Sequence, residues 1–270
     1  MFKLIKRSLI LIIILLIALA YYKNIYLVNK RKADQVKIIA RPEKVITIIE
    51  GWNLKQIDNY LSEQGVNIDR KLASFKVSDY KTDYDFLTDA PAKADLEGYL
   101  FPDTYRVFAS TTADEIVRKM LGNFESKVTP AMITEIGRQQ KTLHQVVTLA
   151  SVVEKEVTSK NDMKVVAGIF WDRIKNGQAL ESCATLAYIL GENKAQYTYE
   201  DTRIESPYNT YINRGLPPGP IANPGLNAIA GTIYSAYTDY NYFLSRPDTR
   251  ETVFSRTYEE HTANKQKYLK

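Results

Sequence analysis

The chain has 270 residues, a net charge of +5 and an isoelectric point near 9.0, and its length suits one large domain or two small ones. Residues 1–32 contain seven lysines and arginines and no acidic side chain. Because the whole chain carries +5 and this segment carries +7, residues 33–270 carry −2. A slightly acidic globular part excludes nucleic-acid binding, because a surface that follows phosphates must be basic.

The N-terminal segment Ser8–Tyr22 is uncharged and almost wholly aliphatic. As a helix it would reach roughly 22 Å, short of the roughly 30 Å hydrocarbon core, but extension to Val28 completes a span if Lys23 snorkels. We therefore expect residues 1–32 to be a single-pass anchor in the cytoplasmic membrane. The alternative is a cleavable signal peptide with Ala18-Leu19-Ala20 as its processing site. Both alternatives place the globular part on the extracytoplasmic side.

The segment after a polar stalk at residues 33–42 begins with a strand pattern. Val45–Glu50 alternates branched side chains, and a turn at Gly51-Trp52-Asn53 then leads into a helix. This helix is predicted to bury one face, formed by Leu54, Ile57 and Leu61. Residues 67–96 carry only weak helical signals, and residues 97–108 are predicted to be an irregular aromatic segment broken by Pro102.

Helices are predicted from residue 112 onward. They begin at a Thr112/Glu115 capping box, at Thr129-Pro130, at a Thr142/Gln145 capping box and at about Asp162. The third ends near Val157, and the fourth ends before Gly177. A proline-rich loop at residues 206–225 is followed by a short helix. A two-strand hairpin is then predicted at Tyr242–Ser245 and Thr252–Ser255, and a terminal helix is predicted from Tyr258. Helices mixed with short antiparallel strands predict an α+β fold.

The third helix carries a carboxylate on its apolar stripe. Leu143, Val147, Ala150, Glu154 and Val157 follow the spacing of one buried helix face. Burial in apolar surroundings raises the pKa of a carboxyl group, as a general acid at neutral pH requires. The alternative is a boundary glutamate paired with a lysine or arginine. Glu156 lies about 200° around the helix and is predicted to face water, and Lys155 also lies off the stripe.

Two aromatic loops accompany this helix, at residues 97–105 and 206–211. Rigid loops that present Tyr, Asn and Thr can hold a sugar by stacking and hydrogen bonding at low entropic cost. The alternative is that the prolines simply stiffen a long connection. Cys183 is the only cysteine, so no intramolecular disulfide can form. His144 and His261 stand far apart without a metal-binding motif, so neither metal nor cofactor is expected.

Several blocks together resemble the YceG-like (MltG) family of endolytic murein transglycosylases. The blocks run in family order over about residues 44–270 and comprise Ile49–Gly51, Glu97–Tyr105, Leu149–Glu156, Phe170–Ile174, Ser206–Tyr211 and Gly215–Gly225. The resemblance implies a membrane-anchored enzyme that cuts the MurNAc–GlcNAc bond within nascent peptidoglycan strands and leaves 1,6-anhydroMurNAc ends. It implies Glu154 as the general acid and base, and cell-wall synthases as candidate partners.

The resemblance also implies further site residues and a domain division. Substrate binding is expected from Glu97, Ser182, Thr185, Tyr208, Asn209 and Thr210. The expected domains are an anchor with its basic flank (1–32), a stalk (33–42), a partial LysM-like segment (43–66) and a catalytic domain (67–270). Many family members carry Asp-Pro where this chain has Cys183-Ala184. Cys183 is interpreted as a small packed residue and not as a nucleophile.

Three other functions are compatible with parts of the sequence. A true hydrolase would pair Glu154 with a second carboxylate such as Glu97, which activates water. A non-catalytic scaffold would bind peptidoglycan without turnover. Ser78-Asp79-Tyr80-Lys81 matches the S-x-x-K pattern of penicillin-binding enzymes, and Ser159-Lys160-Asn161 matches S-x-N. No K-T-G follows them, which disfavours this third function.

Overall fold

The computed structural model describes residues 16–30, 43–66, 69–108, 110–194 and 196–269, and the chain divides into two compact units, 1–43 and 44–270. In the first unit, residues 16–30 are helical. Among the described residues, no helix combines the length and apolar character needed to cross a membrane. Much of the predicted anchor, residues 1–15, and the predicted stalk at residues 33–42 lie outside the described residues.

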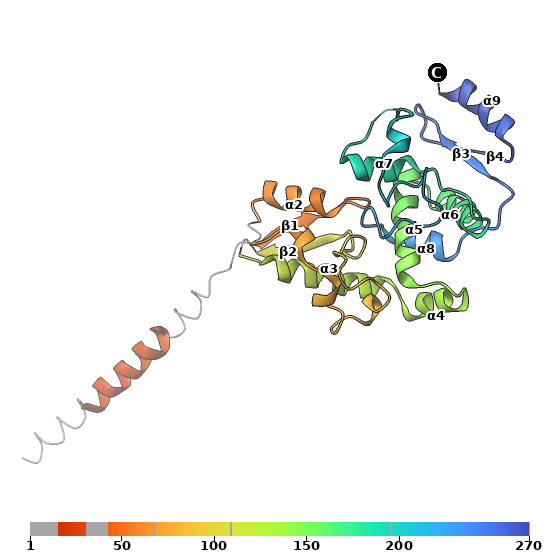
Figure 1. The fold of residues 1–270 in the computed structure, drawn as a ribbon. Helices are drawn as coiled ribbons and strands as arrows, with labels where there is room; N and C mark the ends of the chain where they lie inside the picture. Colours follow the sequence, from red (N-terminus) through yellow and green to blue (C-terminus); the bar gives the residue numbers. More distant parts are fainter. Residues whose placement is uncertain (1–15, 31–42, 67–68, 109, 195, 270) are drawn as a thin grey trace, which may run out of the picture. The chain divides into compact units, whose positions relative to one another are not determined.

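A small sheet and two helices form one part of the second unit, with β1 (Glu43–Thr47) paired to β2 (Thr104–Phe108). The strand predicted from residue 45 is therefore confirmed in part. The prediction of an irregular segment is wrong for β2, where burial alternates along the strand. The partner strand of β2 is β1, which lies almost 60 residues earlier in the chain, so no local sequence signal predicts the pairing. Figure 1 shows these strands near α2 (Leu54–Glu63) and α3 (Ala113–Lys127).

Local capping explains where the helices of this part begin. Asn53 and Gln56 form a capping box at the start of α2, and Thr112 and Glu115 form the predicted one at α3. The buried face of α2 contains the predicted Leu54, Ile57 and Leu61, and it also contains Asp58. The weak helical signals after α2 correspond to three short 3₁₀ helices, η1 (Leu72–Ser74), η2 (Val77–Asp79) and η3 (Asp85–Leu87).

A helical core forms the other part of the second unit, built from α4 (Pro130–Arg138), α5 (Leu143–Glu156), α6 (Lys160–Lys175) and α8 (Leu226–Ile233). Figure 1 shows α5 running through the middle of this group, and α8 packs on both α5 and α6. The capping box at Thr142 is confirmed, whereas the N-cap of α6 is Ser159 and not a residue near 162. Ser159, half of the S-x-N pattern, thus has a helix-capping role.

The C-terminal elements follow the prediction closely. The hairpin of β3 (Tyr242–Ser245) and β4 (Thr252–Ser255) is antiparallel with Tyr242 opposite Ser255, and α9 (Tyr258–Tyr268) packs against it. Two elements were not predicted, namely α7 (Cys183–Leu190) and the short η4 (Asp201–Arg203). Helices combined with small sheets, including this antiparallel hairpin, confirm the α+β class.

Candidate active site

The middle of the helix that carries Glu154 is buried on all sides. Every position of α5 from Val146 to Val153 is buried, so α5 has no continuous water-facing side. The sequence predicted a single buried stripe, which is the pattern of a surface helix. Glu154 follows this buried stretch in the last turn of α5, and its side chain is partly exposed.

The Glu154 carboxylate lies at the start of another helix. Its Oε2 accepts a hydrogen bond from the N–H of Gly225, the N-cap residue of α8, at 2.9 Å. The pKa of Glu154 is raised to about 7, mainly by burial and in smaller part by the negative charge of Glu50. The Gly225 hydrogen bond and the positive charge of Lys155 oppose this shift. Near pH 7 the carboxyl group therefore populates both protonation states, as general acid–base chemistry requires.

A glycine turn brings residues 50–53 against this carboxylate. Gly51 has a φ of +77°, a conformation that side chains other than hydrogen rarely tolerate. A Cβ built there would lie 3.3 Å from Glu154 Cγ and 3.3 Å from Lys155 Cδ. Lys155 Nζ also donates to the Gly51 carbonyl at 3.1 Å. Residues 50–53 therefore form a wall of the site directly beside Glu154.

Asn223 joins the three chain segments around the site. Its N–H and side-chain Nδ2 donate to the Trp52 carbonyl, at 2.8 and 3.0 Å, and its own carbonyl accepts from Gly51 N. Its Oδ1 accepts from the backbone N–H of Gly98 and Leu100 at 2.9 and 3.0 Å. The residue is 0% exposed. Because all of its polar groups are satisfied in the interior, Asn223 fixes these loops relative to one another.

Glu97 belongs to the same buried network. Its Oε2 accepts from Leu54 N at 3.1 Å, and its Oε1 accepts from Asn223 Nδ2 at 2.9 Å. Burial raises the pKa of Glu97 to about 8, against the effect of these donors. Although Glu97 contributes to the lining of a pocket near α2, both of its oxygens are already committed to protein donors.

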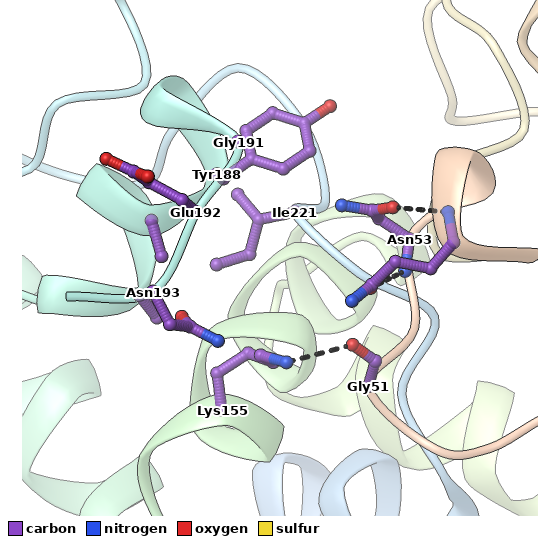
Figure 2. A pocket seen from close by; sticks show the side chains of 11 residues that line it. Gly51, Asn53, Lys155, Tyr188, Gly191, Glu192, Asn193 and Ile221 are labelled. Atoms are coloured by element: carbon purple, nitrogen blue, oxygen red, sulfur yellow. Dashed lines mark hydrogen bonds between the residues drawn. The ribbon is translucent and has the colours of Figure 1, made fainter. Parts of the chain in front are cut away.

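A polar groove runs between the start of α2 and the end of α7. Two adjoining pockets, with volumes of about 110 and 610 Å³, share Asn53, Gln56, Tyr188 and Gly191. Figure 2 shows Tyr188, Glu192 and Asn193 on one side and Gly51 and Asn53 on the other, with Lys155 between them. Amide, phenol and charged groups around a concave surface can supply the directed hydrogen bonds that a sugar or peptide requires.

Four of the predicted substrate-binding residues form a buried network behind this groove. Thr185 Oγ1 and Thr210 Oγ1 are 3.0 Å apart, and Thr210 Oγ1 accepts from Ser182 N at 3.1 Å. Asn209 is 0% exposed and donates Nδ2 to the carbonyls of Thr202 and Ile204. These side chains hold the loop 206–211 against α7, so any effect on substrate passes through the loop that they position.

Tyr208 is the member of the predicted set that lies nearer the surface. The residue is partly exposed, and its ring lies 5.1 Å from the ring of Tyr188, which lines the groove. The two tyrosines thus connect the loop 206–211 to the groove wall. Of the predicted residues, Glu97 and Tyr208 lie closest to the groove, whereas Ser182, Thr185, Asn209 and Thr210 lie behind it.

The prediction that Glu156 faces water is wrong. Its carboxylate accepts a hydrogen bond from Ser182 Oγ and another from the backbone N–H of Ala184. Burial raises the pKa of Glu156, while these donors and Arg173 oppose the shift. Ser182 is the N-cap of α7 but makes no side-chain cap of its own. Glu156 therefore caps α7 from a different helix, which is possible because α7 packs on α5.

Cys183 differs from its sequence interpretation, and His144 lies in the first turn of α5. Cys183 is exposed, and its thiol lies 3.1 Å from the Tyr211 hydroxyl, so it is not a packed interior residue. Although the residue as a whole is exposed, its thiol is partly covered, and this partial burial raises the pKa of the thiol, which disfavours a nucleophilic thiolate. His144 is partly buried and connects Tyr99, 2.9 Å from Nδ1, with the Pro218 carbonyl, 3.2 Å from Nε2.

Several site residues were not singled out from the sequence, namely Glu50, Lys155, Tyr188, Asn223 and Gly225. Glu50, Asn223 and Gly225 lie within blocks that resemble the family, at residues 49–51 and 215–225. That placement was the available signal, because loop residues follow no periodicity that indicates burial or proximity. The groove and the partly buried Glu154 together have the features of a glycan-cleaving site, where a protonatable carboxyl group meets a polar cleft.

The chain belongs to the YceG-like family, whose profile matches residues 25–267. A Bacillus subtilis (strain 168) protein named endolytic murein transglycosylase is 38% identical over 178 residues, which cover 66% of this chain and 49% of that protein. A protein of the same name from Streptococcus pneumoniae serotype 2 (strain D39) is 32% identical over 240 residues, covering 81% and 43%. The chain thus spans less than half the length of these curated relatives.

A solved structure also resembles the chain. The crystal structure of a putative yceG-like protein from Listeria monocytogenes aligns with a TM-score of 0.68 and 31% sequence identity. The alignment covers 87% of this chain and 79% of that one. The family resemblance of the sequence blocks is therefore confirmed by both sequence and fold.

Proposed function

We propose that the chain is an endolytic lytic transglycosylase, which cuts the MurNAc–GlcNAc bond within nascent peptidoglycan strands and leaves 1,6-anhydroMurNAc ends. The observation that carries this function is Glu154, whose carboxyl group has a pKa of about 7 and whose neighbours Gly51 and Lys155 line a polar groove. The curated relatives named endolytic murein transglycosylase support the choice of substrate and reaction.

In this reaction Glu154 acts first as an acid and then as a base. Its proton passes to the oxygen that bridges the two sugars, and the C1–O bond breaks with the electron pair on the departing oxygen. The C6 hydroxyl oxygen then bonds to C1, and its proton passes to the Glu154 carboxylate. No water is consumed, and Glu154 returns to its protonated form. A pKa near the working pH makes both transfers accessible to one group.

Substrate contact is assigned to the groove and the aromatic pair beside it. Tyr208 and Tyr188 offer ring faces for sugar stacking, and Asn53 offers an amide for hydrogen bonding. Glu97, Ser182, Thr185, Asn209 and Thr210 contribute by holding the surrounding loops, because their polar atoms are bonded within the protein.

The hydrolase alternative is less well supported. Such an enzyme would require a second carboxylate that activates water, and Glu97 was the residue considered for that role. The two Glu97 oxygens accept hydrogen bonds from Leu54 N and Asn223 Nδ2, and the side chain is buried. A scaffold without turnover would not require a carboxyl group poised between its two protonation states.

We further assign residues 1–32 to a membrane anchor, 33–42 to a stalk, 43–66 to a LysM-like segment and 67–270 to the catalytic domain. In this arrangement the catalytic domain works on the extracytoplasmic side of the cytoplasmic membrane, where cell-wall synthases produce its substrate. The apolar character of Ser8–Tyr22 supports the anchor.

Product analysis tests the proposed reaction. Purified full-length chain is incubated with peptidoglycan glycan strands, and the new ends are identified by mass spectrometry. Endolytic transglycosylation cuts long strands internally and leaves fragments with anhydro ends. Hydrolysis instead leaves reducing ends, which are heavier by one water. Reducing ends as the main product would refute the transglycosylase assignment, and an absence of new ends would favour the scaffold.

A further inference from the structure

A second carboxylate lies at the site without a protein partner. Glu50 stands in the turn between β1 and α2, and its residue is exposed. Within the part of the chain that the structure describes, its side chain makes neither a hydrogen bond nor an ion pair. This exposed carboxylate is therefore available to a ligand.

Gly225 brings Glu50 and Glu154 together. The N–H of Gly225 donates to Glu154 Oε2 at 2.9 Å. On the same residue, a Cβ would lie 2.7 Å from Glu50 Cγ and would overlap the Glu50 carboxyl group. One glycine thus contacts both carboxyl groups, and only a residue without a side chain permits this approach. Glu50 is also followed directly by Gly51, whose Cα faces Glu154 Cγ.

We propose that Glu50 is a second catalytic carboxylate, which faces the sugar beside Glu154 and stabilises the positive charge that develops at C1 as the glycosidic bond breaks. This inference rests on the proposed transglycosylase function. Charge placed where a transition state develops charge is among the strongest catalytic effects that a protein can supply. Glu50 would transfer no proton, so the balance of the two Glu154 transfers is unchanged.

The charges around Glu154 give Glu50 a second effect on the same reaction. Lys155 on α5 is the nearby cation, and its Nζ is held by the Gly51 carbonyl. The α8 terminus contributes the Gly225 N–H, and the turn before α2 contributes Glu50. An anion at residue 50 disfavours a second negative charge on Glu154. It therefore helps Glu154 keep its proton before cleavage and recover a proton from the C6 hydroxyl afterwards.

The Glu50→Gln variant removes the charge of Glu50 while leaving the fold intact. Because the side chain has no protein partner to lose, the near-isosteric amide should leave the melting temperature unchanged. Glu63→Gln is a matched control, since Glu63 is an exposed glutamate at the end of α2 in the same segment. Glu154→Gln reports separately on the proposed function.

The experiment measures anhydro-end formation by the full-length wild-type chain and these three variants across a pH series. We expect Glu50→Gln to lower kcat by on the order of tenfold or more and to move the alkaline limb of the pH profile to lower pH. The limb moves this way because Glu154, without its anionic neighbour, loses its proton more easily. Glu63→Gln should match the wild type.

Three results would overturn the inference in distinguishable ways. If Glu154→Gln is inactive but Glu50→Gln keeps both the wild-type rate and pH profile, Glu50 has no catalytic role and the proposed function stands. If Glu154→Gln itself remains active, the proposed function falls and the role of Glu50 falls with it. Reducing ends that disappear in Glu50→Gln would instead make Glu50 a water-activating base, which contradicts charge stabilisation.

Discussion

At the scale of single residues, the site depends on polar atoms that are fully used inside the protein. Asn223 bonds with its backbone and with both ends of its amide, and it joins residues 51–52, 97–100 and the loop before α8. An asparagine in a proline-rich loop would ordinarily be interpreted as a turn residue. Its role here follows from partners more than 100 residues away, which no local pattern can indicate.

Replacement of Asn223 should therefore destabilise the fold strongly. Asn223→Ala leaves the N–H groups of Gly98 and Leu100 without an acceptor, and we expect a loss of at least about 2 kcal/mol in the free energy of unfolding. Asn223→Asp should cost as much despite its equal size, because the new oxygen cannot donate to the Trp52 carbonyl and lies against it instead. Denaturant unfolding measures both variants, and Asn161→Ala, at an exposed position of α6, should be nearly neutral. An unchanged Asn223→Asp variant would refute the hydrogen-bonding role.

At the scale of secondary-structure elements, local signals predicted the helices that carry their own caps. The capping boxes at Thr112 and Thr142 and the proline at residue 130 identified α3, α5 and α4. In contrast, β2 depends on pairing with β1, and α7 begins without a side-chain cap from its own sequence. Both were missed because the groups that complete them lie elsewhere in the chain.

Glu156 supplies the missing cap of α7, so its removal should loosen that helix. Glu156→Ala leaves Ser182 Oγ and the Ala184 N–H without their acceptor, and we expect a loss of about 1–3 kcal/mol in the free energy of unfolding. Turnover should also fall, because α7 carries Tyr188 into the groove. Hydrogen exchange of α7 amides is the specific measurement. Faster exchange confined to α7 is expected, and unchanged exchange would contradict the cap.

At the scale of the whole molecule, α5 forms the centre on which distant loops assemble. Glu154 could be identified from its own helix because the apolar spacing around it is local. The mistake over Glu156 had the same origin, since the sequence was interpreted as a helix with one exposed side. In the structure α7 covers that side, and the walls formed by residues 50–53 and 220–225 arise from tertiary contacts alone.

Buried carboxyl groups should also set the pH dependence of stability. The pKa of Glu97 is raised to about 8 and that of Glu154 to about 7, so the folded chain binds more protons than the unfolded chain above pH 4.5. This contribution to stability is complete below the unfolded pKa and is lost as pH rises toward 8. His261, whose pKa is lowered, opposes the trend between these limits.

The Glu97→Gln variant tests this linkage. The variant loses the acceptor for Leu54 N and should be less stable than the wild type at acidic pH. Its stability should nevertheless decline less between about pH 5 and pH 8, because the variant lacks one of the carboxyl groups that hold a proton in the folded chain and release it on unfolding. Denaturation midpoints across this range give the two slopes, and equal slopes would contradict the raised pKa of Glu97.

The central claim is that Glu154 is the acid and base of a peptidoglycan transglycosylase. The most direct measurement is the rate at which purified Glu154→Gln forms anhydro ends on glycan strands, compared with the wild-type rate. Equal melting temperatures of the two proteins show that the variant is folded. We predict a loss of at least about a hundredfold, the usual scale for removing a general acid. A folded Glu154→Gln variant that still forms anhydro ends at close to the wild-type rate would contradict the account.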